Sequence, residues 1–524
     1  MGNDWDVGAD RAPDAPAELA DGERAATDGP CRAATGGNAT YAMVCYGPPP
    51  LMTDHGILTR EIDEGPSGPA IGAFFDLDRT LIAGFSAGAF VREWLTSGRA
   101  APTDVAAAVV AGTAFQFGQK NFSAFVSESL AMVRGLSEEE FAEIGERIFG
   151  HSISASIYPE SRALVDAHRA KGHSLAVISS ATRSRVAPVA RELGIEHVFC
   201  TELEVKDGKL TGQIVRPACY GQGKADAAQR FAMDRGIDLD DSYFYTDSDE
   251  DLPLLLIVGR PRPINPSRRL QSIAAKRIWP SRSFSSRGMP SVTDVVRTSL
   301  SLASVMPSFL LGLPAAILDG DFRQAVNLAA TTWGELGTAL AGIHVTVDGE
   351  EHLWSKRPAV FIFNHQSGVD PLLICKLLRR DFVGISKQEV RGIPVLGQLF
   401  QLAGTIFIDR FNHAEAIKAL EPAVEALRRG LSIAIAPEGT RSIGPRLGRF
   451  KKGAFRMAMA GGVPVVPIVI HNSIDALPKH GIIIRPASVA VTVLPPVATL
   501  DWTHEDLDER IEAIRAEYKR VLGL

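Results

Sequence analysis

The sequence predicts an α/β protein in which two parallel-sheet domains are joined by an apolar helical segment. Short apolar runs alternate with helical patterns between residues 70 and 275, and the alternation resumes after Ile343. Between these regions, residues 298–318 form an uncharged stretch of 21 positions. The 524 residues leave room for two to four domains, at roughly 100–200 residues each.

The composition indicates a chain that buries sizeable cores in a reducing compartment. Hydrophobic residues make up 45% and charged residues 22%, as is typical of globular domains. Five scattered cysteines argue against a disulfide framework or a zinc site: Cys31, Cys45, Cys200, Cys219 and Cys375. Residues 341–524 carry 23 Lys and Arg against 19 Asp and Glu. This mild excess suits an anionic lipid or a phosphorylated ligand, and we expect no nucleic-acid partner.

Residues 1–68 are predicted to form a disordered acidic tail. They hold twelve Asp and Glu against four Arg and Lys and are rich in Ala, Gly and Pro. The first 50 residues have neither a basic start nor an apolar core of about 7–15 residues. We therefore expect no signal peptide there.

The first α/β domain is expected over residues 69–275. Short apolar runs predict buried strands, and the stretches between them predict helices. The expected strands are 70–75, 174–178, 197–200 and 242–245, and the expected helices are 160–171, 183–193 and 224–235. A long, largely helical region at about 84–160 follows the first strand, and Lys206-Asp207-Gly208-Lys209 is typical of a turn. Strands that alternate with helices favour a parallel sheet.

Polar side chains follow three of these strands. Asp76 and Asp78 come directly after the first strand, Ser179 after the second, and an acidic run from Asp247 to Asp251 after the last; Lys224 opens a helix. In an open parallel sheet, ligands bind at the carboxyl ends of the strands. Close carboxylates repel unless a proton or cation lies between them, and Mg²⁺ prefers such oxygen ligands.

This set of residues predicts phosphoryl transfer. Asp76 is the expected nucleophile, which forms an aspartyl-phosphate, and Asp78 the expected proton donor and acceptor. Ser179 and Lys224 are expected to hold the phosphoryl oxygens. The predicted metal ligands are Asp76, Asp78, Asp247 and Asp251.

The motifs resemble the haloacid dehalogenase-like hydrolases, in particular the phosphoserine-phosphatase-like branch. Four motifs occur in order: Asp76-Leu77-Asp78-Arg79-Thr80-Leu81, Ile178-Ser179-Ser180, Gly223-Lys224-Ala225-Asp226, and Thr246-Asp247-Ser248-Asp249-Glu250-Asp251. The resemblance implies a Rossmann-like parallel sheet, Mg²⁺ dependence, and a helical cap over about 84–160. Phosphoserine phosphatases typically have Ser where this chain has Arg79, which puts an amino-acid substrate in doubt. The alternative is a regulatory module that binds a phosphorylated metabolite.

Residues 276–342 are expected to form a basic linker and a membrane-associated helical segment. Seven Lys and Arg residues lie within 265–297, a stretch that we expect to be irregular and cytosolic. Residues 298–318 are long enough to span a bilayer, whereas 324–343 is weaker. One span, two spans, a re-entrant hairpin or an interfacial helix pair all fit, as does a buried hairpin in a soluble linker. We expect association with the cytoplasmic side of the membrane through about residues 298–343.

The second α/β domain is expected over residues 343–524. Buried strands are predicted at 360–363, 431–436 and 465–470, and a helix at 413–429. The last helix, at about 504–521, carries a single apolar face, and Thr503 is its expected cap.

Two features of this domain indicate chemistry. His365 and Asp370 follow a strand, so the carboxylate can fix the tautomer of the imidazole and leave its other nitrogen as a base. Pro437-Glu438-Gly439-Thr440-Arg441-Ser442 follows another strand. Gly439 lets the backbone approach a ligand, and Arg441 can grip a phosphate. Arg410 offers a further guanidinium group.

These blocks resemble the glycerolipid acyltransferases, in particular the 1-acylglycerol-3-phosphate acyltransferases, over about residues 345–500. The resemblance implies that His365, oriented by Asp370, deprotonates a lysophosphatidate hydroxyl, which then attacks an acyl thioester. It implies a glycerol-phosphate site built from Arg410, Glu438, Gly439 and Arg441. Acyl-CoA and acyl carrier protein both fit as donors. The whole chain is thus interpreted as a bifunctional, membrane-associated acyltransferase and Mg²⁺-dependent phosphatase of phospholipid biosynthesis.

Overall fold

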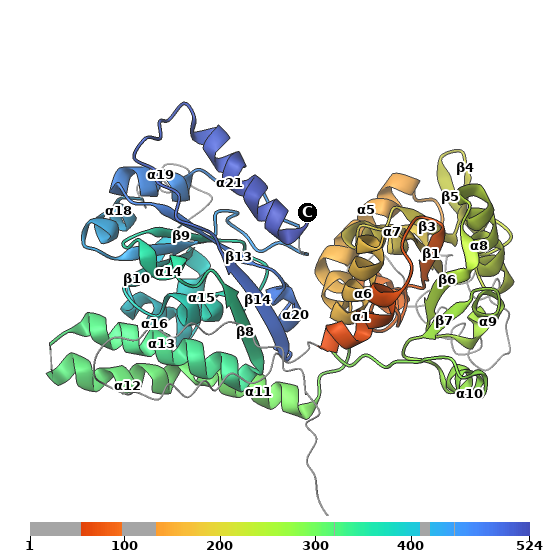
Figure 1. The fold of residues 1–524 in the computed structure, drawn as a ribbon, viewed down its shortest axis with the longest axis horizontal. Coiled ribbons are helices and arrows are strands. Elements are labelled where there is room, and N and C mark those ends of the chain that lie inside the picture. The colour runs from red at the N-terminus through yellow and green to blue at the C-terminus, as the bar shows by residue number, and fades with distance from the viewer. Residues whose placement is uncertain (1–53, 97–132, 319, 409–419, 445) are drawn as a thin grey trace, which may run out of the picture. The chain divides into compact units, whose positions relative to one another are not determined.

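The computed structural model describes residues 54–96, 133–318, 320–408, 420–444 and 446–524. Within these ranges two large β-sheets form, one from residues 71–263 and one from residues 343–493, beside a separate two-stranded sheet (Figure 1). The α/β class predicted from the sequence is confirmed, with a parallel sheet in the N-terminal region. The two sheet-containing parts are described one at a time.

The first sheet has five parallel strands in the order β3-β2-β1-β6-β7. Their bounds are β1 Ile71–Phe75, β2 Ser174–Thr182, β3 His197–Thr201, β6 Asp238–Thr246 and β7 Arg260–Pro263. A separate hairpin, β4 Leu203–Lys206 and β5 Lys209–Ile214, closes at the predicted turn. The four predicted strands are therefore present, β7 was not predicted, and Ser179 lies inside β2 rather than after it.

Helices cover both faces of this sheet. One core lies between β1 and the helices α1 Asp54–Glu64, α5 Glu138–Ile148, α6 Pro159–Ala170 and α7 Arg183–Glu192. The other lies between the sheet and the helices α8 Gln222–Arg235, α9 Leu252–Leu255 and α10 Arg268–Arg277. The expectation of irregular structure from residue 265 was wrong for α10, because Ser267 caps this helix by accepting a hydrogen bond from the Leu270 backbone N–H.

The predicted helical cap at about 84–160 falls partly on described residues. There it contains α2 Ser86–Thr96 and α5, and α5 begins with a capping box between Ser137 and Glu140. Residues 97–132 lie outside the described ranges.

The second sheet has seven strands in the order β11-β10-β12-β9-β13-β14-β8. All neighbours are parallel except β13 and β14. The bounds are β8 Ile343–Asp348, β9 Val360–Phe363, β10 Phe382–Lys387, β11 Ile406–Ile408, β12 Ser432–Ile435, β13 Val465–Ile470 and β14 Ala487–Val493. The three predicted strands correspond to β9, β12 and β13, which are adjacent in the sheet.

Two apolar layers sandwich this sheet. The first contains α14 His352–Ser355, α15 Asp370–Leu378 and α20 Ser473–Ala476. The second contains α18 Leu420–Arg428, α19 Gly453–Gly461 and α21 Leu507–Leu522. The last helix begins later than predicted, with Asp506 at the N-cap position. The predicted cap Thr503 exchanges hydrogen bonds with it: Thr503 Oγ1 accepts the Asp506 N–H at 3.3 Å, and Asp506 Oδ1 accepts the Thr503 N–H at 2.9 Å. The seven-residue α16 Leu396–Leu402 also lies in this part.

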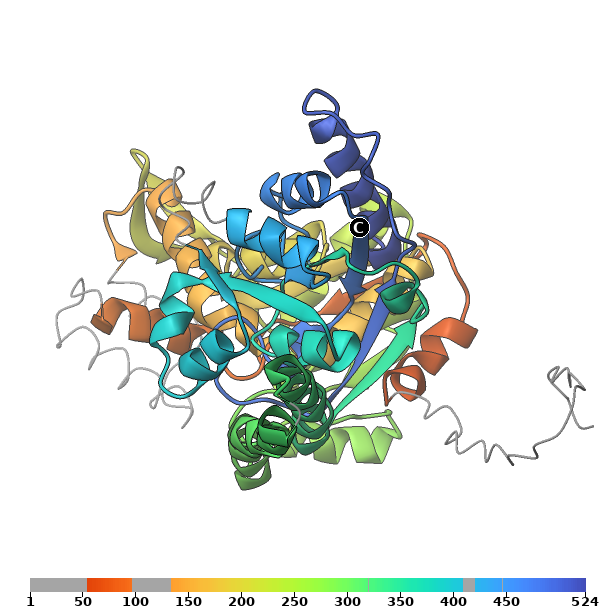
Figure 2. The same ribbon diagram turned by 90° about the vertical axis from the view of Figure 1, so that its left-hand side faces the viewer.

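Three helices precede the second sheet: α11 Val292–Ala303, α12 Val305–Leu318 and α13 Phe322–Ala341. Figures 1 and 2 show them grouped together, and α13 also packs against α15. Among the described residues, one helical stretch, Val292–Pro314, has the length and composition of a membrane span, and 33% of its most apolar window is buried. Long apolar side chains on these helices remain exposed, including Leu300, Leu302, Leu310, Leu311, Leu313 and Ile317.

Candidate active sites

The first sheet brings the predicted phosphoryl-transfer residues to one edge. β1 lies between β2 and β6, and all three are parallel. The backbone N–H of Asp76 donates to the carbonyl of Tyr245 at 2.9 Å, so Asp76 and Asp247 leave neighbouring strands together. Asp76, Ser179 and Asp247 are all buried.

Lys224 lies between two of the acidic residues. Its Nζ is 3.1 Å from Asp76 Oδ1 and 2.7 Å from Asp251 Oδ2, and Thr246 Oγ1 donates to the same Asp251 oxygen at 2.5 Å. Burial disfavours the charged lysine, but the charges of Asp251 and Asp76 outweigh it and raise the pKa of Lys224. Lys224 therefore stays cationic beside the expected nucleophile, and Asp251 holds it there.

The surroundings of Asp78 suit a proton donor. Its carboxylate accepts hydrogen bonds from the Ser86 backbone N–H at 2.7 Å and from Ser86 Oγ at 3.3 Å. Burial raises the pKa of Asp78, while the charge of Arg185 and the Ser86 N–H oppose the rise. A raised carboxyl pKa favours the protonated form that a general acid needs. The sequence did not reveal Arg185, which belongs to no motif.

Arg79 forms an ion pair with Asp247. Its Nη1 lies 3.0 Å from Asp247 Oδ2, and its Nη2 donates to the carbonyl of Asn265 at 3.0 Å. Arg79 has a left-handed backbone with φ of 56°, which is uncommon for a residue with a side chain. The Asn265 side chain donates to the Arg79 carbonyl at 2.7 Å and so holds this turn.

Asp76 and Asp247 have the chemistry of Mg²⁺ ligands. Both offer buried carboxylate oxygens, and within the described residues Asp76 Oδ1 has only the ion pair with Lys224 as a polar partner. Their charges lie close enough to oppose each other, which a divalent cation would relieve. Across the ranges described above, no group of three or more His, Cys, Asp and Glu is arranged to hold a metal. The predicted roles of Asp78 and Asp251 as ligands stay predictions, since Ser86 and Lys224 bind their carboxylates here.

The pKa of Asp247 predicts a stability that changes with pH. Burial, followed by the charge of Asp76, raises this pKa from 3.8 to about 8. The folded protein then binds a proton that the unfolded chain releases between these values. The free energy of unfolding without metal should therefore fall as the pH rises from about 4 to 8. We expect Asp247→Asn to flatten this slope in urea titrations at a series of pH values; an unchanged slope would contradict the assignment.

In the second sheet, β9 and the start of α15 build a histidine–carboxylate pair. His365 Nδ1 lies 2.7 Å from Asp370 Oδ2, and the Asp370 side chain is fully buried. The backbone N–H groups of Gln366 and Ser367 also donate to Oδ2, each at 2.9 Å. Ser473 Oγ donates to Oδ1 at 2.6 Å.

The hydrogen bonds to Asp370 determine which ring nitrogen of His365 carries the hydrogen. An ionised carboxylate only accepts hydrogen bonds, so Nδ1 carries the hydrogen and Nε2 keeps its lone pair. The predicted pairing of His365 with Asp370 thus exists in the fold and leaves a base at Nε2. Ser473, 103 residues away in sequence, was not found because it lies in no recognisable motif.

Glu438 links the backbone of the histidine turn to that of Gly448. Its Oε1 accepts the backbone N–H of His365 at 2.8 Å, and its Oε2 accepts that of Gly448 at 2.7 Å. Burial raises the pKa of Glu438, and the two N–H groups partly offset this. Glu438 therefore positions the backbone of His365, a role that differs from the predicted contact with glycerol phosphate.

A cluster of three basic residues lies beside the histidine turn. A side-chain carbon at Gly368 would be 3.4 Å from Arg441 Nη1, so Arg441 rests against this turn. Ser367 Oγ donates to the Leu477 carbonyl at 2.6 Å, which brings the segment that carries Lys479 to the same turn. Lys387 ends β10, at the same edge of the parallel strands β10, β12 and β9. Burial, and then the charges of Arg441 and Lys387, lower the pKa of Lys479. Over the described parts of the chain, none of them pairs with a carboxylate. Such a cluster is typical of a phosphate site.

Gly439 and Arg410 were also predicted to belong to this site. Gly439 has φ of +80°, and a side-chain carbon there would lie 3.0 Å from Lys451 Nζ. A glycine is therefore needed for this turn. Arg410 lies outside the described residues. Lys479 was not predicted from the sequence, because a single lysine after a short helix belongs to no recognisable motif.

Comparison with known proteins matches the two parts separately. Residues 73–256 match the family model of the haloacid dehalogenase-like hydrolases, and residues 344–471 match an acyltransferase model. A 1-acyl-sn-glycerol-3-phosphate acyltransferase of Limnanthes alba is 38% identical over 197 residues, which are 37% of this chain and 69% of that protein. A Mycobacterium leprae protein named as a hydrolase is 32% identical over 251 residues, 47% of this chain and 82% of its own.

Among solved structures, a 1-acyl-sn-glycerophosphate acyltransferase from Thermotoga maritima is 23% identical, with a TM-score of 0.38. The match covers 45% of this chain and 98% of that one. The relatives in sequence settle the classification. The chain belongs to two families at once, the haloacid dehalogenase-like hydrolases in its N-terminal part and the 1-acylglycerol-3-phosphate acyltransferases in its C-terminal part.

Proposed function

We propose that the C-terminal part acylates 1-acyl-glycerol-3-phosphate to phosphatidate with an acyl thioester. The observation that carries this proposal is the His365–Asp370 pair at 2.7 Å next to the cations Arg441, Lys387 and Lys479. The pair supplies a base for a hydroxyl group. The cations supply the counter-charge for a phosphate on the same molecule.

The reaction can be written with the residues of this site. His365 Nε2 takes the proton of the acceptor hydroxyl, while Asp370 stabilises the imidazolium through Nδ1. The acceptor oxygen attacks the thioester carbonyl carbon, the C–O bond forms, and the C–S bond breaks. The leaving sulfur takes the proton from Nε2 as a thiol. No covalent acyl-enzyme is required.

The N-terminal part is proposed to hydrolyse a phosphomonoester. Asp76 attacks phosphorus, and Asp78 first protonates the leaving oxygen and later takes a proton from water. Lys224 and Ser179 hold the phosphoryl oxygens. Mg²⁺, when bound by Asp76 and Asp247, supplies positive charge for the transferring group. Phosphatidate, the product of the other part, is the substrate that we propose, which would make the two activities consecutive.

A single assay tests the proposal. Purified protein is given lysophosphatidate, acyl-CoA and Mg²⁺, and both phosphatidate and diacylglycerol are followed. We expect phosphatidate first and diacylglycerol after a lag. Phosphatidate that accumulates without diacylglycerol would reject the consecutive reaction, and the absence of both products with acyl-CoA and with acyl carrier protein thioesters would reject the acyl transfer itself.

We further propose that α11, α12 and α13 attach the protein to the cytoplasmic side of a membrane. Leu310, Leu311 and Ile317 are 57%, 58% and 77% exposed, although exposed apolar patches of this kind are costly in water. Their exposure together on α12 fits insertion among lipid chains.

Replacement of two of these leucines should weaken membrane binding. Each leucine that enters the apolar layer contributes roughly 1.5–3 kcal/mol, so Leu310→Ser with Leu311→Ser should lower vesicle partitioning by at least about tenfold. Co-sedimentation with anionic phospholipid vesicles measures this. Leu256→Ser removes a leucine that is 48% exposed in the N-terminal part and should have no effect. Equal binding of both variants would refute the proposed attachment.

A further inference from the structure

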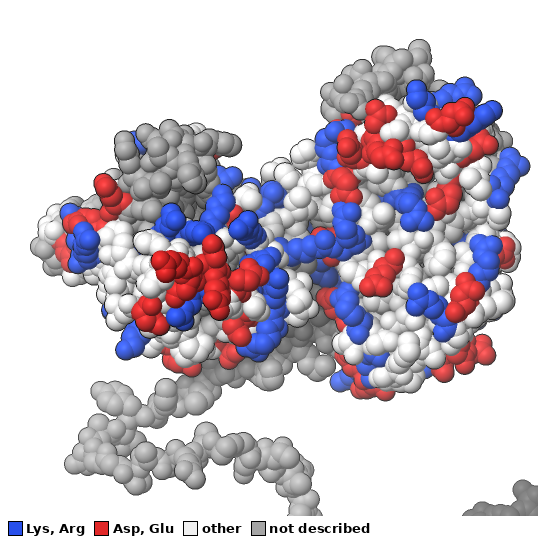
Figure 3. Space-filling view, turned by 90° about the horizontal axis from the view of Figure 1, so that it is seen from above, with Lys and Arg blue, Asp and Glu red and all other residues white. Residues whose placement is uncertain are grey.

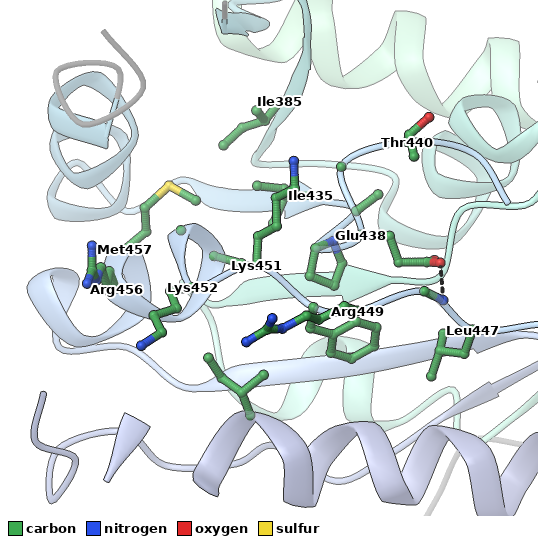
Figure 4. A pocket seen from close by; sticks show the side chains of 18 of the residues that line it. Ile385, Ile435, Glu438, Thr440, Leu447, Arg449, Lys451, Lys452, Arg456 and Met457 are labelled. Atoms are coloured by element: carbon green, nitrogen blue, oxygen red, sulfur yellow. Dashed lines mark hydrogen bonds between the residues drawn. The ribbon is translucent and has the colours of Figure 1, made fainter. Parts of the chain in front are cut away.

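A large pocket opens beside the Glu438 loop (Figure 4). It has a volume of about 1090 Å³ and is bounded by the ends of β10, β11 and β12 and by α19 and α21. The apolar part of its wall comes from residues on several of these elements: Ile385, Ile408, Ile435, Met457 and Ile511. This volume slightly exceeds the range typical of small-molecule pockets, about 300–1,000 Å³, so the pocket can hold an extended ligand.

The polar part of the wall carries an excess of basic groups. The basic residues are Arg446, Arg449, Lys451, Lys452 and Arg456, and the acidic ones are Glu438, Asp508 and Glu512. In Figure 4, Arg449, Lys452 and Arg456 reach toward the left of the view. The pocket thus joins an apolar surface to a positively charged one.

The acidic residues of this wall already have partners. Asp508 pairs with Lys452 at 2.7 Å, Glu512 pairs with Arg515 at 2.8 Å, and Glu438 accepts two backbone N–H groups. Over the ranges that the structure describes, no carboxylate pairs with Arg449, Lys451 or Arg456. Three cations in one pocket therefore keep their charge available for an anionic ligand.

The pocket is tied to the catalytic histidine. Glu438, which lines the pocket, holds the N–H of His365 with one oxygen and the N–H of Gly448 with the other. Ser442, also in the wall, donates its N–H to the His365 carbonyl at 2.8 Å. A ligand that fills the pocket would thus end next to the backbone that carries the base.

We propose that this pocket binds the acyl donor, with the phosphates of a coenzyme A thioester on Arg449, Lys451 and Arg456 and the acyl-pantetheine arm along the apolar wall. This inference rests on the proposed acyl transfer. The acceptor phosphate has its own cations, Arg441, Lys387 and Lys479, so the second set is left for the donor. The cations line a recess, which suits a nucleotide better than the broad surface of a carrier protein.

Direct binding of coenzyme A tests the assignment without any acceptor. Isothermal titration calorimetry on the full-length protein should show binding to the wild type. Arg449→Gln with Arg456→Gln should weaken it by about tenfold or more, because two charge-assisted phosphate contacts are lost. Pantetheine, which lacks these phosphates, should bind both proteins alike. Arg428→Gln serves as the control, because Arg428 is an exposed residue of α18 that does not line the pocket. This variant should bind coenzyme A like the wild type.

Kinetics separate this inference from the proposed function. In the double variant the KM for acyl-CoA should rise while the KM for lysophosphatidate stays unchanged. The protein could bind coenzyme A through Arg449 and Arg456 and yet acylate no lysophosphatidate. That result would support the assignment of the pocket and would reject lysophosphatidate as the acceptor. Equal coenzyme A binding in the wild type and the double variant, or transfer only from a carrier-protein thioester, would overturn the inference.

Discussion

His365→Ala should lower kcat for phosphatidate formation by about 10²–10⁴-fold, the range that general acid–base groups contribute. The imidazole is the proposed site of both proton transfers, and the Nδ1 contact with Asp370 at 2.7 Å holds it in one tautomer. Alanine removes the base but keeps the backbone N–H that donates to Glu438. Initial rates at saturating lysophosphatidate and acyl-CoA give the comparison.

Two further measurements show whether the loss is chemical. Coenzyme A binding and the thermal unfolding of His365→Ala should stay close to the wild type. Within the described residues the side chain hydrogen-bonds to Asp370 and packs beside the Phe363 ring, and Asp370 keeps its other hydrogen-bond donors. His471→Ala serves as the matched control, because His471 contacts Thr492 at 2.9 Å and is not part of the proposed mechanism. A variant at His365 that keeps most of its rate would rule out this residue as the base.

Asp76→Asn should lower phosphatase activity by about a thousandfold or more, because an amide cannot form the aspartyl-phosphate. The substitution also removes one of the two charges beside Lys224. Release of inorganic phosphate from phosphatidate and from p-nitrophenyl phosphate measures the effect. Asp207→Asn makes the same change in an exposed turn and should keep full activity.

The same variant separates an enzyme from a regulatory module. If the N-terminal part is a phosphatase, Asp76→Asn should abolish diacylglycerol formation and leave phosphatidate formation unchanged. If it is a sensor of a phosphorylated metabolite, the wild type should release no phosphate, and the response of acyl transfer to that metabolite should survive the substitution. Phosphate release that is equal in wild type and Asp76→Asn would exclude Asp76 as the nucleophile.

On the face seen in Figure 3, small groups of Lys and Arg lie between small groups of Asp and Glu. The basic groups that matter for the proposals are therefore local clusters. The sequence count for residues 341–524 could show only a mild excess of positive charge. It could not show that two sets of cations form near one histidine loop.

Local sequence patterns determined the α/β class and the catalytic pairs. Strands such as β1, β9 and β12 are short apolar runs. Because the strands beside them are parallel, the polar residues that follow each strand lie at the carboxyl-terminal edge of its own sheet. Asp76 and Asp78 lie two residues apart in one loop, so the sequence could predict that they belong to one site. His365 and Asp370 lie five residues apart across a turn, so their pairing could be predicted as well. The weaker predictions concerned ends of elements: α10 was missed, and α21 was predicted to begin at about residue 504 but begins at Leu507.

Only the tertiary structure decided which distant groups complete these pairs. Lys224 and Asp251 are 27 residues apart, Ser473 and Asp370 are 103 apart, and Glu438 and His365 are 73 apart. Hydrogen bonds of this kind depend on which strands become neighbours and in what register, and no short pattern encodes that choice. The same holds for the coenzyme A pocket proposed above, since its walls come from five separate elements that meet only when the second sheet and its helices have packed.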